Sequence, residues 1–104
     1  MSYKVILDPE VTSKDLKKIS HIQVKLVFKQ LKKLRESPEL GKPLGNKAGY
    51  DLSGCRKLYV DKKKIRIVYT IIEERIVVEV IAVGKREDMA VYRLAAQRRD
   101  KGNQ

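Results

Sequence analysis

The sequence predicts an α+β domain: a mostly antiparallel four-stranded sheet, two N-terminal helices packed on one face, and a further helix at the C-terminus. Between residues 10 and 37, apolar residues recur at helical spacing. From residue 54 to 83 they instead form short runs joined by brief charged links, a pattern typical of antiparallel strands. The chain has 104 residues. That length is enough for one domain, residues 1–104, around one modest core.

The first elements expected are a strand and a short helix. Tyr3–Leu7 predicts the strand, because this β-prone run is ended by Asp8-Pro9. Glu10–Ile19 follows, and its weakly periodic apolar residues predict the short helix.

A longer helix comes next and leads into a loop. Ser20 and Gln23 have the spacing of a capping box, which predicts that the helix begins there. Ser37-Pro38 predicts its end. Its expected core residues are Val24, Val27, Phe28, Leu31 and Leu34. Residues 37–54 carry two prolines and four glycines, and they predict a surface loop.

Three strands and a last helix are expected in the second half. The strands are Gly54–Val60, Ile65–Ile72 and Arg75–Val83. The short links, residues 61–64 and 73–74, make neighbouring strands antiparallel. Gly84 breaks the sheet, and Asp88 is placed to cap a helix that runs to about Arg99.

The links also predict which side chains meet across the strands. We expect Tyr59 opposite Arg66 in the first hairpin, and Ile72 opposite Arg75 in the second, which would put Ile81 across from Arg66. One face is then almost wholly apolar and packs against the helices. Its members are Leu58, Val60, Ile65, Ile67, Tyr69, Ile71, Ile76, Val78, Val80 and Ala82. The other face should be open, concave and positive, and it gathers Lys57, Tyr59, Arg66 and Arg86 with Thr70 and Glu79 nearby.

The charge balance bears on function. Lys and Arg number 24 against 13 Asp and Glu, which gives a net charge of +11. Such an excess favours a polyanionic partner, and cations beside a tyrosine favour RNA, because cations hold phosphates and a ring can stack an unpaired base. The alternatives are a soluble basic protein without such a partner and a sheet face that is merely solvated.

Other classes of protein are excluded or disfavoured. No apolar run approaches the ~20 residues that span a bilayer, and the N-terminus lacks the basic and apolar regions of a secretory signal. Cys55 is the one cysteine and His21 the one histidine. An internal disulfide and Cys- or His-cluster metal sites are therefore excluded, no metal or cofactor is expected, and a cytoplasmic location is favoured. His21 lies before or at the second helix and is expected to be a surface or cap residue.

Four segments carry a resemblance to a known family: Cys55–Tyr59 (CRKLY), Ile65–Tyr69 (IRIVY), Val83–Glu87 (VGKRE) and Val91-Tyr92. Together they resemble the RelE branch of the RelE/ParE toxin superfamily. The earlier strand-helix-helix order is similar too, so the resemblance covers nearly the whole chain and implies the RelE-like order βααβββα. Members are small, basic, cytosolic toxins of bacterial toxin–antitoxin pairs, and RelE-type members cut mRNA in the ribosomal A site.

The resemblance implies catalytic roles for Lys57, Arg66, Arg86 and Tyr92. It implies metal-independent cleavage in which the RNA 2′-OH attacks the phosphodiester, Lys57 serves as base, the arginines clamp the phosphate, and Tyr92 stacks on a codon base. Where the family places a second lysine, this chain has Tyr59, which could relay a proton. The expected substrate contacts are Tyr59, Lys62, Lys63, Lys64 and Lys85.

The same resemblance implies partners and leaves two other functions open. The partners are a cognate antitoxin protein, mRNA on the ribosome with A-site rRNA, and operator DNA reached through the antitoxin; no membrane is expected. One alternative is a ParE-like inhibitor of DNA gyrase. The other is a noncatalytic nucleic-acid-binding module, which the missing second lysine keeps open.

Overall fold

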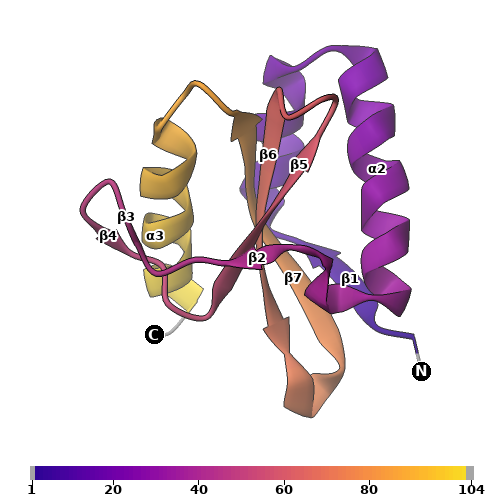
Figure 1. Ribbon diagram of the computed structural model, residues 1–104, viewed down its shortest axis with the longest axis vertical. Helices are drawn as coiled ribbons and strands as arrows, with labels where there is room; N and C mark the ends of the chain where they lie inside the picture. Colours follow the sequence, from indigo (N-terminus) through magenta and orange to yellow (C-terminus); the bar gives the residue numbers. More distant parts are fainter. Residues whose placement is uncertain (1, 103–104) are drawn as a thin grey trace.

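The structure, a computed structural model, describes residues 2–102 and has a five-stranded sheet at its centre (Figure 1). The strand order is β1-β7-β6-β5-β2, and β1 runs parallel to β7 while the other neighbours are antiparallel. The strands are β1 (Lys4–Leu7), β2 (Lys42–Pro43), β5 (Cys55–Val60), β6 (Ile65–Ile72) and β7 (Val77–Lys85). The predicted α+β class is confirmed. The sheet has five strands where four were expected, because β2 adds an edge strand.

The expected first helix is divided in two. α1 covers Pro9–Ser13, and a 3-10 helix, η1, covers Asp15–Lys18. The side chain of Asp8 caps α1 by accepting a hydrogen bond of 2.9 Å from the backbone N–H of Glu10. The break between α1 and η1 places Asp15 in the interior, where only 2% of its surface is exposed.

The long helix α2 (His21–Glu36) begins as its capping box predicts. The N–H of Gln23 donates to Oγ of Ser20, and the N–H of Ser20 donates to Oε1 of Gln23, each at 3.1 Å. Val27, Leu31 and Leu34 are buried. Phe28, expected in the core, is 41% exposed, because it lies about 100° around the helix from Val27 and outside the row that contacts the sheet.

The expected surface loop over residues 37–54 is folded onto the sheet. It contains a 3-10 helix, η2 (Pro38–Leu40), the edge strand β2, and a hairpin of β3 (Asn46–Lys47) with β4 (Tyr50–Asp51). Gly41 donates its N–H to the phenol oxygen of Tyr69 at 2.8 Å. Its carbonyl accepts a 2.7 Å hydrogen bond from Arg56. Leu44 and Leu52 of this segment are buried.

The turn between β6 and β7 is longer than expected. We predicted Ile72 opposite Arg75, but Ile72 lies opposite Val77. A 3-10 turn, η3 (Glu73–Arg75), occupies the link, and Ile76 takes a left-handed conformation with φ of 55°. Ile76 is therefore an exposed turn residue and not the core strand residue that the sequence predicted.

Strand β7 also carries a bulge. Ile81 is the extra residue between the partners of Val68 and Tyr69, so the pairing register shifts by one beyond this point. The longer turn shifts the pairing by two residues and the bulge by one, so Arg66 lies opposite Gly84 and not opposite Ile81.

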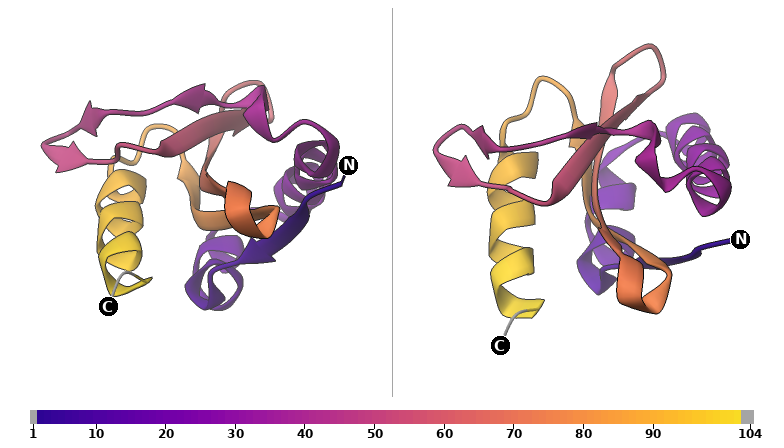
Figure 2. Two further views of the ribbon diagram at one scale, coloured as in Figure 1. Left: turned by 90° about the horizontal axis from the view of Figure 1, so that it is seen from below. Right: turned by 60° about the horizontal axis from the view of Figure 1, so that its bottom comes forward.

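The sheet separates two hydrophobic clusters, one on each face. α1 and α2 cover one face, and α3 (Ala90–Gly102) covers the other, as Figure 2 shows. The first cluster includes Val11, Val27, Leu31, Leu34, Ile65, Ile67, Tyr69, Val78 and Val80. The second includes Leu44, Leu52, Cys55, Val68, Ile81, Ala82, Val91, Tyr92 and Ala95. Both clusters differ from the predicted faces. Ala82, expected on the face that packs against the N-terminal helices, belongs to the second cluster. Much of the face expected to be open lies beneath α3 and the β3–β4 hairpin.

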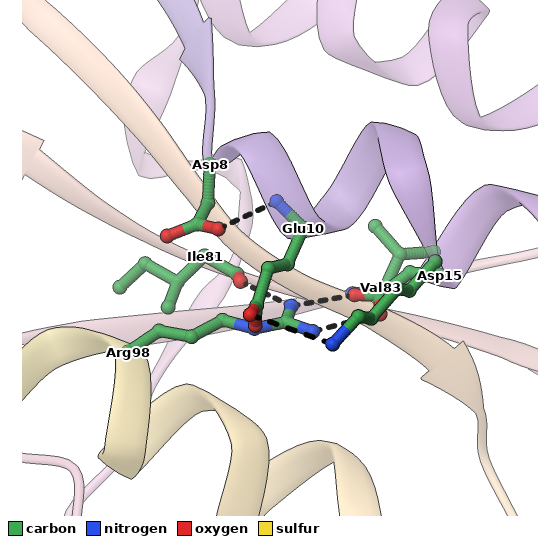
Figure 3. A network of polar contacts seen from close by, with 7 residues as sticks. Asp8, Glu10, Asp15, Ile81, Val83 and Arg98 are labelled. Carbon is green, nitrogen blue, oxygen red and sulfur yellow. Dashed lines mark hydrogen bonds and ion pairs between the residues drawn. The ribbon is translucent and has the colours of Figure 1, made fainter.

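A buried ion-pair network ties α3 to the N-terminal segment (Figure 3). Arg98 donates to both carboxylate oxygens of Asp15, at 2.7 and 3.0 Å, and to the carbonyl of Ile81 at 2.9 Å. It also donates to Glu10 at 2.9 Å, while Asp15 accepts the N–H of Val83. These contacts, Asp15 first, raise the pKa of Arg98 above its ordinary value. The network therefore fixes α3 against α1, η1 and β7.

Candidate functional site

Tyr59 lies at the centre of a cluster of cations contributed by three parts of the chain. Lys57, also on β5, donates a 3.3 Å hydrogen bond from Nζ to the Tyr59 phenol oxygen and lies 5.3 Å from the ring centre. The guanidinium carbons of Arg66 on β6 and of Arg86, which follows β7, each lie 5.7 Å from the same ring centre. Lys57, Tyr59, Arg66 and Arg86 thus converge as the sequence predicts, and we call them the Tyr59 cluster.

Local strand geometry places these side chains together. Lys57 and Tyr59 are two positions apart on β5 and so share a face. Tyr59 lies opposite Arg66, which confirms the predicted register of the first hairpin. Arg86 is held beside this hairpin because its backbone N–H donates to the carbonyl of Lys64 at 2.9 Å.

Arg66 is buried, although we expected it on an open surface. Only 5% of Arg66 is exposed, and its guanidinium carbon lies 4.4 Å from the ring centre of Tyr92 on α3. Its Nε and Nη1 are buried without a hydrogen-bond partner among the described residues. A buried guanidinium with unpaired N–H groups is suited to bind an anion, because such groups are costly to leave unpaired.

Tyr92 is also buried, with 2% of its surface exposed. The family resemblance implies that the ring of Tyr92 stacks on a codon base. In the structure, this ring packs against the guanidinium of Arg66. The position of α3 on the sheet therefore constrains the orientation of the Arg66 guanidinium.

The surrounding cations change the acidity of Tyr59. Arg66 first, and Lys57 after it, lower the pKa of the Tyr59 phenol to about 8, while partial burial opposes them. A phenol with this pKa is ionised to roughly a tenth at pH 7, far more than an ordinary tyrosine. Its oxygen can therefore accept a proton near neutral pH.

A basic cavity of about 540 Å³ opens beside the Tyr59 cluster. It is lined by Gln23, Lys62, Lys63, Lys64, Lys85, Arg86 and Glu87. The four lysines that the resemblance assigned to the substrate are exposed here, on the β5–β6 turn and at the end of β7. Asp61, Lys62 and Lys63 all have positive φ, between 54° and 70°, and this turn projects the lysines away from the sheet.

Sequence reasoning did not find the contribution of α2. The side chain of Gln23 donates to Asp61 at 3.0 Å and so supports the β5–β6 turn. Lys29 and Lys33 line a second groove that also includes Tyr59. The sequence singles out Gln23 only as a cap of α2, and the only signal for Lys29 and Lys33 is a helix face rich in lysine, which is more often solvated than functional.

The structure also places the candidate metal and thiol ligands of residues 2–102. This part of the chain holds no group of three or more His, Cys, Asp or Glu side chains that could bind a metal ion. His21 is exposed at the start of α2, as predicted. Cys55 is buried, and burial raises the pKa of its thiol. In the same residues, no helix has the length and apolar character needed to cross a membrane.

Comparison with known proteins identifies the family. The family described as ParE toxin of type II toxin-antitoxin system matches residues 5–90. The chain belongs to the RelE/ParE toxin superfamily.

Its relatives include RelE proteins. The mRNA interferase toxin RelE of Escherichia coli K12 is 34% identical over 98 residues, which cover 94% of this chain and 98% of that protein. A free E. coli RelE variant has 31% identity, covers 94% of this chain and 98% of its own, and superimposes with a TM-score of 0.76. The intact E. coli RelBE toxin–antitoxin complex contains a chain with 28% identity and a TM-score of 0.65, over 81% of this chain and 96% of that one. These relatives favour the RelE branch over a ParE-like gyrase inhibitor.

Proposed function

We propose that this protein is the toxin of a type II toxin–antitoxin pair and that it cleaves mRNA in the ribosomal A site. The observation that carries the proposal is the Tyr59 cluster, in which a buried arginine with unpaired N–H groups lies beside a second arginine, a lysine and an acidified phenol. The E. coli relative named an mRNA interferase supports the same conclusion.

The chemistry needs neither a metal nor a protein nucleophile. RNA supplies the 2′-OH, so the protein has to remove its proton, orient the phosphate, stabilise the developing charge and protonate the leaving 5′-oxygen. Arg66 and Arg86 remain protonated and are suited to clamp the phosphate. The proton acceptor then comes from the pair formed by Lys57 and Tyr59. Tyr92 contributes by holding Arg66 in place.

The basic surface and the relatives also support the partners. Lys62, Lys63, Lys64 and Lys85 around the cavity are suited to the phosphates of mRNA and A-site rRNA. A solved RelE chain occurs in complex with its antitoxin. By analogy, a cognate antitoxin binds and neutralises this protein and carries the complex to operator DNA.

The test is cleavage mapping on a translated message, with and without ribosomes. We expect cuts within A-site codons only when ribosomes are present, and their loss in Arg86→Ala. The matched control is Arg75→Ala, which removes another exposed arginine, from η3 on the turn between β6 and β7. Both variants should keep the wild-type thermal midpoint to within a few degrees, because both side chains are exposed and support little of the core. Binding to ribosomes without any cleavage would instead favour the noncatalytic module.

A further inference from the structure

We propose that Tyr59 is the proton acceptor that activates the 2′-hydroxyl, in the position where the family resemblance places a second lysine. This inference rests on the proposed function, because it names the base for that cleavage. It moves the role of base from Lys57, where the resemblance places it, to Tyr59, which the sequence predicts only as a substrate contact and a possible proton relay.

The geometry favours the phenol oxygen over the other groups of the Tyr59 cluster. Lys57 donates a hydrogen bond of 3.3 Å to this oxygen, and an ammonium in that position stabilises the ionised phenol. Arg66 and Arg86 do not lose protons in proteins, so neither can serve as a base. Tyr59 is partly exposed beside the groove lined by Lys62 and Lys63, where a backbone phosphate can approach.

In the proposed step, the pair of Tyr59 and Lys57 exchanges protons with the RNA during one displacement at phosphorus. The Tyr59 phenolate takes the proton of the 2′-OH while the 2′-oxygen forms a bond to phosphorus. The bond from phosphorus to the 5′-oxygen breaks, and the Lys57 ammonium gives a proton to that oxygen. The products are a 2′,3′-cyclic phosphate and a 5′-hydroxyl. The new phenol proton then passes to the neutral Lys57 amine across their hydrogen bond, which restores both groups.

Charged groups from every neighbouring element support an ionised Tyr59. Lys57 on β5, Arg66 on β6 and Arg86 after β7 surround the ring. The grooves that include Tyr59 add cations from α2, the turn and β2, namely Lys29, Lys33, Lys62, Lys63 and Lys42. The one acidic residue lining these two grooves is Asp61, whose carboxylate accepts a hydrogen bond from Gln23. The pKa of about 8 for Tyr59 agrees with this surplus of positive charge.

The first experiment measures single-turnover cleavage on programmed ribosomes between pH 6 and 9. The wild-type rate should rise with pH and level off near pH 8, because only the ionised phenol accepts the proton. Tyr59→Phe keeps the ring against the arginines but lacks the oxygen. We expect it to lose at least about 10²-fold in rate, and to lose the rise that ends near pH 8. Thermal unfolding shows that the variant is folded.

The second experiment shifts the inflection of the pH–rate profile while Tyr59 itself is kept. Lys57→Gln removes an ammonium that favours the phenolate, so the inflection should shift to higher pH, in addition to any loss of rate. Lys4→Gln is the matched control, because it removes one exposed lysine from β1, at the opposite edge of the sheet from β5 and β2. It should leave the inflection in place. The ultraviolet titration of tyrosinate in the free protein should show one phenol ionising near pH 8 in the wild type and none in Tyr59→Phe.

The outcomes separate the two proposals. Ribosome-dependent cleavage by Tyr59→Phe at a rate within threefold of the wild type, with an unchanged pH profile, overturns the role of Tyr59 and leaves the proposed function standing. If the wild type does not cleave, the proposed function is overturned, and so is the assignment of Tyr59 as its base. The tyrosinate titration is independent of ribosomes, and absence of an ionisation near pH 8 also contradicts the assignment.

Discussion

Removing the carboxylate of Asp15 should destabilise the protein more than any surface substitution. Asp15→Ala takes away the acceptor of two hydrogen bonds from Arg98 and of the backbone N–H of Val83. Arg98, which is 6% exposed, then keeps two acceptors among the described residues, the carbonyl of Ile81 and the carboxylate of Glu10. Breaking a buried ion pair costs about 3–5 kcal/mol, and the remaining Glu10 contact suggests a value near the lower end, about 3 kcal/mol.

A double-mutant cycle distinguishes this reasoning from simple loss of packing. Arg98→Met should cost a similar amount, because it leaves Asp15 buried with one hydrogen-bond donor, the N–H of Val83. The double variant Asp15→Ala with Arg98→Met should recover part of the loss, because the buried ion pair is then removed as a whole and the remaining cost is the N–H of Val83 without its acceptor. Lys14→Ala is the control, since it breaks an exposed pair with Glu10 and should cost no more than about 0.5 kcal/mol.

The assay is urea unfolding of the five proteins at one pH and salt concentration. The reasoning is refuted if Asp15→Ala costs less than about 1 kcal/mol. It is equally refuted if the two single changes add without coupling in the double variant.

Four further predictions concern packing, backbone and charge. Ile67→Ala should lower the free energy of unfolding by about 3–4 kcal/mol, because Ile67 is fully buried. Gly41→Ala should lower the thermal midpoint by several degrees, because a Cβ there would lie 2.6 Å from the phenol oxygen of Tyr69; an unchanged midpoint would contradict this. Lys63→Gly should raise the free energy of unfolding by about 0.5–1 kcal/mol in urea, because Lys63 has φ of 70° and glycine adopts this conformation without strain. The rate of association with the cognate antitoxin should fall as salt rises, and a flat profile over a tenfold range of salt would argue against electrostatic steering.

The parts of the fold that could be predicted depend on local rules. The capping box of Ser20 and Gln23 and the cap at Asp88, which accepts the N–H of Ala90 at 2.9 Å, are set by residues close in sequence. The pairing of Tyr59 with Arg66 follows from the length of one short turn. These local rules were sufficient to predict that most residues of the Tyr59 cluster lie close together.

The parts that could not be predicted depend on tertiary contacts or on unfavourable backbone. Ile76 is β-branched and has positive φ, a combination that no sequence rule favours, so the β6–β7 register could not be anticipated. The bulge at Ile81 has no sequence signal either. The burial of Arg66 depends on Tyr92, and the place of Tyr92 depends on how α3 docks through Arg98.

The parallel pairing of β1 with β7 has a consequence for the order of events during synthesis. Lys4 pairs opposite Val77, so β1 has no strand partner until β7, more than 70 residues later in the chain, has been made. Pairings between such distant segments form late and slowly. Arg86 and Tyr92 are made after β7 begins, so a nascent chain lacks both the completed sheet and the full Tyr59 cluster. A toxin that acts as proposed is therefore inactive on the ribosome that is translating it until Arg86 and Tyr92 have been added, because the Tyr59 cluster is incomplete before then.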